Sequence, residues 1–121
     1  MKKIYHLANC DTCQKIIKTW KPGKDFILQN IKEEPITAKQ VDEMIALAGS
    51  AEILFSRRAL KYKSMGLAEK KLTEKDYRQL IIDEYTFLRR PVMIVDKKIF
   101  IGNAPSNVQE AKTYLDSLKK K

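Results

Sequence analysis

The apolar positions along the chain follow two different periods, and their order predicts a mixed α/β protein. Lys2–His6 and Asp25–Gln29 are short runs that predict strands, whereas Thr12–Trp20 places its apolar side chains at helical spacing. Lys21-Pro22-Gly23 ends this helix, because proline and glycine break the pattern. This part of the chain therefore predicts a βαβ unit with parallel strands and a right-handed crossover.

The middle of the chain shows helical spacing throughout. Thr37-Ala38-Lys39-Gln40 is a capping-box sequence that opens a helix, and Gly49 is a natural end for it. Two further helices are predicted over Ile53–Lys63 and Thr73–Asp83. We therefore expect an all-helical insert over about residues 37–84.

The last part of the chain returns to strands. Val92–Val95 and Ile99–Ile101, joined by Asp96-Lys97-Lys98, predict an antiparallel hairpin. Ser106-Asn107-Val108-Gln109 is a second capping-box sequence and predicts the start of a final helix. The order βαβ, helices, ββα predicts a thioredoxin-like α/β fold with a mixed four-stranded sheet, as one domain over residues 1–121.

Composition and charge limit the cellular location and the binding partners that we expect. No apolar run reaches membrane-spanning length, and the start of the chain lacks the apolar core of a signal peptide, so we expect a cytoplasmic protein without membrane association. The formal net charge is +9, which suits an anionic substrate or an acidic protein partner. No nucleic-acid motif accompanies this charge, so direct nucleic-acid binding is not expected.

Cys10 and Cys13 carry the strongest chemical signal. They are the only two cysteines, and they fall between a predicted strand and a predicted helix. A helix N-terminus favours an anion, so this position suits a reactive thiolate at Cys10 with Cys13 one turn away. Two buried, inert thiols are the alternative. A metal is not expected, because two cysteines and one histidine leave a zinc site short of ligands.

Further candidate residues flank this motif in the sequence. His6, at the end of the first strand, either moves a proton or simply completes the strand. Arg57-Arg58 and Arg89-Arg90 suit an oxyanion, because guanidinium groups offer forked donors. By fold-level analogy, Pro91 is a cis proline that faces the thiol and brings Arg90 to the edge of the site.

These residues together resemble the arsenate reductase (ArsC) family of the glutaredoxin-coupled type, including its Spx-type relatives. The resemblance runs nearly end to end. It is carried by Ile4-Tyr5-His6 before Cys10, Glu34-Pro35-Ile36-Thr37, Met65-Gly66-Leu67-Ala68-Glu69 and Leu88-Arg89-Arg90-Pro91-Val92. It implies a thioredoxin-like fold with a helical insert and a redox-active Cys10. It also implies that His6 tunes the thiol and that Arg90 contacts the oxyanion.

One arginine assignment is ambiguous, and the chain departs from the family at two positions. Arg58 matches a position that Spx-type members keep as arginine, although the choice between Arg57 and Arg58 stays open. The reductases carry an arginine where this chain has Gln14, and another in the late hairpin region, at Ile101-Gly102-Asn103. Each lost charge-assisted contact is worth roughly 1.5–3 kcal/mol. The oxyanion pocket is therefore expected to bind arsenate less well.

The leading interpretation is an enzyme, an oxidoreductase whose Cys10 attacks arsenate or an oxidised thiol. Cys13 then resolves the adduct, with Arg58 and Arg90 beside the anion. No bound cofactor is expected, and glutathione with glutaredoxin, or thioredoxin, is the external reductant. The alternative is an Spx-type regulator that binds RNA polymerase and uses the Cys10–Cys13 disulfide as a redox switch.

Overall fold

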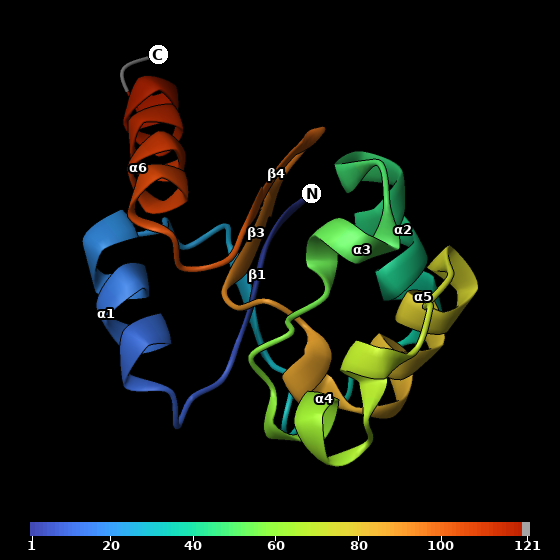
Figure 1. Ribbon diagram of the computed structural model, residues 1–121. Helices are drawn as coiled ribbons and strands as arrows, with labels where there is room; N and C mark the ends of the chain where they lie inside the picture. The colour runs from blue at the N-terminus through green and yellow to red at the C-terminus, as the bar shows by residue number, and fades with distance from the viewer. Residues whose placement is uncertain (120–121) are drawn as a thin grey trace. The chain divides into compact units, whose positions relative to one another are not determined.

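The structure is a computed structural model that describes residues 1–119, and it divides into two compact units (Figure 1). The first unit joins Met1–Glu34 to Arg90–Lys121, and the second runs from Pro35 to Arg89. The second unit therefore contains the segment for which a helical insert is expected. That the whole chain forms one domain stays a prediction.

The first unit is built on a four-stranded mixed sheet in the order β2-β1-β3-β4. Its strands are β1 (Lys2–His6), β2 (Ile27–Asn30), β3 (Val92–Val95) and β4 (Lys98–Ile101). β1 runs parallel to β2 and antiparallel to β3, and β3 and β4 form the expected antiparallel hairpin. The predicted α/β class and mixed sheet are confirmed.

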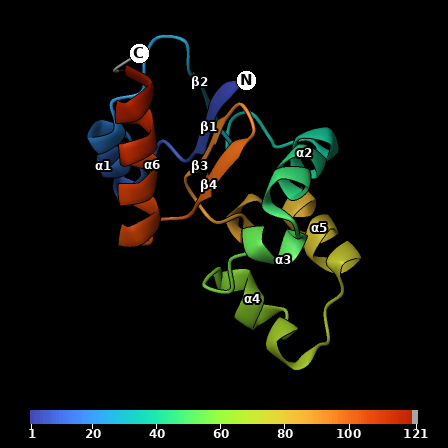
Figure 2. The same cartoon turned by 90° about the horizontal axis from the view of Figure 1, so that it is seen from above.

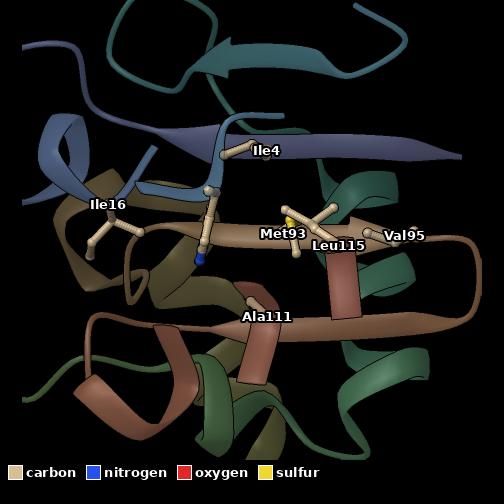
Figure 3. Close-up of a cluster of buried hydrophobic side chains, with 7 residues drawn as sticks. Ile4, Ile16, Met93, Val95, Ala111 and Leu115 are labelled. Atoms are coloured by element: carbon tan, nitrogen blue, oxygen red, sulfur yellow. The ribbon is translucent and has the colours of Figure 1, made fainter. Parts of the chain in front are cut away.

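Two helices, α1 (Asp11–Trp20) and α6 (Pro105–Lys119), pack side by side on one face of this sheet (Figures 1 and 2). Apolar side chains from both helices and from the central strands β1 and β3 meet between them (Figure 3). The buried members of this cluster are Ile4, Ile16, Trp20, Met93, Val95, Ala111 and Leu115. This packing fixes α1, and with it the two cysteines at its N-terminal end.

The second unit is helical. Its elements are α2 (Ala38–Ala48), α3 (Ala51–Leu54), α4 (Leu60–Ser64), η1 (Leu67–Glu69), α5 (Glu74–Asp83) and η2 (Tyr85–Phe87), where η denotes a 3₁₀ turn. The predicted capping box is present at Thr37, whose hydroxyl accepts a hydrogen bond from the Gln40 backbone N–H at 3.1 Å. Gly49 ends α2 with φ of 96°, a conformation that favours glycine.

Two predicted helix boundaries are wrong. The helix expected over Ile53–Lys63 is interrupted at Phe55, which is fully buried and bridges to Leu88 in an antiparallel pair. The Phe55 ring stacks on Phe87 with centroids 5.0 Å apart, so the burial of an aromatic side chain overrides the helical pattern. The last helix begins at Pro105 rather than with a Ser106 cap, because the fixed φ of proline suits a first helical position.

Candidate functional site

The two cysteines lie at the junction of β1 and α1, as the sequence predicts. Cys10 is the N-cap residue of α1, and Cys13 lies in its first turn. Both thiols are free; Cys10 is half-buried, whereas Cys13 is 1% exposed. The Cys13 thiol lies within hydrogen-bonding reach of the Cys10 side chain. The pair therefore consists of one half-buried and one buried thiol that lie close together.

Hydrogen bonds to one carbonyl hold the loop that carries Cys10. The Leu7 carbonyl accepts from the Cys10 backbone N–H at 3.2 Å and from Gln14 Nε2 at 3.2 Å. At the other side of the loop, the Ala8 backbone N–H donates to Asn30 Oδ1 at 3.3 Å. Gln14 thus helps to hold the loop that carries Cys10. Sequence reasoning singled out Gln14 only as a departure and did not identify Asn30, because neither hydrogen bond follows from a local pattern.

The Cys13 thiol has a raised pKa because of its surroundings. Burial raises the pKa of the Cys13 thiol to about 11, and the hydrogen bond and charge of the Cys10 side chain act in the same direction. The Leu7 backbone and the positive charge of Arg90 oppose this increase in pKa without cancelling it. Cys13 is therefore protonated at neutral pH.

Alkylation of Cys13 is expected to keep accelerating with pH beyond the ordinary thiol pKa of 9.0. The measurement is the iodoacetamide rate of the folded Cys10→Ser variant, with the urea-unfolded variant as control. Burial, the largest cause of the raised pKa, remains in this variant.

The raised pKa also makes the stability depend on pH. Because the pKa of Cys13 is higher in the folded state than in the unfolded state, the free energy of unfolding should fall as the pH rises from 9.0 towards about 11. A folded midpoint below the unfolded one would contradict this assignment.

His6 lies at the end of β1 and is buried, with 9% of its surface exposed. Burial lowers the pKa of this imidazole, and the Leu7 backbone does not offset that effect. Among residues 1–119, no hydrogen bond satisfies its Nδ1. His6 is therefore neutral at physiological pH, and its role towards the thiols stays a prediction.

Arg90 and Pro91 belong to the same unit as the cysteines. The Arg90–Pro91 peptide bond is cis, and the charge of Arg90 reaches Cys13, where it favours the thiolate. The preceding residue, Arg89, is used differently: its Nε donates to the Phe55 carbonyl at 3.1 Å within the helical unit. Of this arginine pair, Arg90 is the member near the thiols.

Arg57 and Arg58 belong to the helical unit. Arg57 Nη2 donates to Glu52 Oε2 at 2.8 Å and to the Tyr77 hydroxyl at 3.1 Å. Arg58 is exposed, and no side-chain hydrogen bond or ion pair of Arg58 is found within residues 1–119. Arg57 is thus committed to its own unit. That Arg58 lines the thiol site stays a prediction.

No group of three or more histidine, cysteine, aspartate or glutamate side chains in residues 1–119 is arranged to hold a metal ion. Over the same residues, no helix has the length and apolar character needed to cross a bilayer.

The sequence and the fold both match known proteins. Residues 5–111 match the ArsC family. The global transcriptional regulator Spx 2 of Bacillus cereus is 28% identical over 116 residues, which cover 93% of this chain and 85% of the regulator. The regulatory protein MgsR of Bacillus subtilis is 27% identical over 109 residues, covering 87% of this chain and 85% of MgsR.

Solved structures support the same fold. The arsenate reductase from Vibrio cholerae is similar with a TM-score of 0.73 at 15% identity, covering 91% of this chain and 96% of the reductase. An arsenate reductase related protein from Brucella melitensis has a TM-score of 0.66 at 22% identity, covering 90% of this chain and 92% of that protein. With the family match spanning most of its length, this chain belongs to the ArsC family.

Proposed function

We propose that this protein is a thiol–disulfide oxidoreductase in which Cys10 attacks an oxidised substrate and Cys13 resolves the adduct. One observation carries the proposal: the half-buried Cys10 at the start of α1 lies close to a buried Cys13 thiol whose pKa is raised to about 11. A helix N-terminus favours negative charge at Cys10, and Cys13 holds its proton until the second step.

With arsenate as the substrate, the reaction has two steps. The Cys10 thiolate displaces one arsenate hydroxyl, which takes up a proton from solvent and leaves as water, and a bond forms between sulfur and arsenic(V). Cys13 then gives up its proton and attacks the Cys10 sulfur. The sulfur–arsenic bond breaks with its electron pair on arsenic, so arsenite leaves and the two thiols become one disulfide.

The same residues handle a disulfide substrate. Cys10 attacks one sulfur of the substrate disulfide and expels the other as a thiolate, which leaves a mixed disulfide on Cys10. Cys13 then attacks the Cys10 sulfur and releases the bound half of the substrate as a second thiolate. In either reaction, an external dithiol of the thioredoxin class, or glutathione with glutaredoxin, reduces the Cys10–Cys13 disulfide. The positive charge of Arg90, which acts to lower the pKa of Cys13, also favours an anionic substrate or thiolate beside the two cysteines. Arg58 and His6 are proposed to support the anion and the proton transfer.

The test is NADPH-coupled turnover by the reduced protein, with the thioredoxin and the glutaredoxin–glutathione systems supplied separately. Arsenate and hydroxyethyl disulfide are the two substrates. Turnover of either one supports the oxidoreductase, and the ratio of the two rates identifies the substrate class. Absence of turnover with both substrates and both donors would sink the enzyme proposal.

The second candidate function is regulation of transcription, with the thiol pair as a switch. The observation favouring it is the similarity to Spx 2 and MgsR, which cover most of this chain. Under this proposal the oxidised protein binds RNA polymerase and has no substrate to turn over. Comparing RNA polymerase capture by the oxidised and reduced forms separates it from the enzyme.

A further inference from the structure

A groove of about 330 Å³ lies within the helical unit, alongside η1 and the start of α5. Its apolar lining comes from Met65, Leu67, Leu72 and Leu80. Leu67 is buried, with 3% of its surface exposed, whereas Met65 is 46% exposed. A flexible methionine at the mouth of an apolar groove adapts to more than one side chain. The lining therefore suits an aliphatic or aromatic anchor.

The charge around this groove is positive. Lys70 and Lys71 contribute to its wall and are exposed. Neither ammonium has a hydrogen bond or ion pair within the described part of the chain, residues 1–119. The carboxylate in the wall, Asp76, already accepts from the Thr73 backbone N–H at 2.8 Å as part of the α5 capping box. Two cations are thus left to face whatever occupies the groove.

We propose that this groove binds an acidic segment of a partner protein, a helix that inserts a leucine or a similar side chain against the apolar lining and turns its carboxylates towards Lys70 and Lys71. Helix-in-groove recognition combines an apolar anchor with charges on the rim, and both are present here. A nucleic-acid backbone would leave the four apolar side chains without a contact. A second copy of the chain carries the same charge of +9 and is repelled.

This surface involves neither cysteine, so it is tested independently of the redox proposal. The probe is a fluorescein-labelled synthetic helical peptide with leucines on one face and glutamates on the other. Binding to the full chain is followed by fluorescence anisotropy at several salt concentrations. We expect saturable binding that weakens as salt increases, because the rim contacts are ionic. A peptide with its leucines changed to alanine should bind about ten-fold more weakly or worse.

Matched variants locate the site. Lys70→Glu combined with Lys71→Glu should weaken binding about ten-fold or more. Lys24→Glu with Lys32→Glu changes the net charge equally, at two exposed loop positions of the other unit, and should have little effect. Met65→Ser removes the exposed anchor contact without opening the core and should also weaken binding.

Three results would overturn the proposal. The first is absence of peptide binding, and the second is equal loss in the two charge-reversal variants. The third is a DNA duplex that binds more tightly than the peptide, depends on Lys70 and Lys71, and is insensitive to Met65→Ser, which would make the surface a nucleic-acid site.

Discussion

Cys10→Ser is expected to lower turnover by about three orders of magnitude or more, with arsenate or with a disulfide substrate. Serine keeps the size of the side chain but has no accessible thiolate, and Cys13 is too buried and too basic to replace it. The measurement is the NADPH-coupled rate with each electron donor. A variant that keeps more than a tenth of the rate would show that Cys10 is not the nucleophile.

Cys13→Ser is expected to separate the two steps. The first attack still occurs, because Cys10 is unchanged, but no thiol remains to attack the adduct. With a disulfide substrate, intact-protein mass spectrometry should show one stable mixed disulfide, and thioredoxin-coupled turnover should stop. Glutathione can attack the adduct from solution, so part of the glutaredoxin-coupled rate should survive.

Thr12→Ser is the matched control for both variants. Thr12 lies between the two cysteines, is exposed, and takes no part in the proposed chemistry. It should retain nearly full activity. Equal losses in Thr12→Ser and Cys13→Ser would mean that the cysteine variants report distortion of the loop instead of the loss of a thiol.

The fold was largely predictable because its signals are local. Strand runs, the Thr37 capping box and the Cys10–Cys13 junction all depend on neighbours in the sequence, and each is present in the structure. The interruption at Phe55 was not predictable in this way. Its cause is a cluster of rings contributed by distant segments, and a helical pattern carries no information about it.

The residue types of the site were predictable from the sequence, but the contacts that each arginine makes were not. Two adjacent arginines look equivalent in sequence, yet Arg89 is tied to the Phe55 carbonyl and Arg90 acts on Cys13. Likewise, Arg57 is bound by Glu52 and Tyr77, which leaves Arg58 as the member of its pair with an uncommitted side chain among residues 1–119. Tertiary contacts decide these roles, so sequence spacing alone left them open.

Trp20→Ala is expected to lower the free energy of unfolding by about 3–5 kcal/mol. Trp20 is completely buried between α1, the sheet and α6, and its Nε1 donates to the Val108 carbonyl at 3.0 Å. The change opens a large cavity and removes the indole hydrogen bond to α6. Urea unfolding followed by circular dichroism measures it. Thr19→Ala, at the neighbouring exposed position, should stay within about 0.5 kcal/mol.

The same substitution should also disturb the thiols at the other end of α1. A loss of about 3–5 kcal/mol is a large share of the ~5–15 kcal/mol that stabilises a typical domain, so openings that expose the helix become far more frequent. Cys13 lies in the first turn of α1 and is 1% exposed, so openings that undock this helix are expected to expose its thiol. Iodoacetamide should therefore modify Cys13 faster in Trp20→Ala than in the wild type at the same pH. An unchanged rate alongside a large stability loss would mean that the thiol end of α1 is held independently, by the Leu7 loop and Gln14.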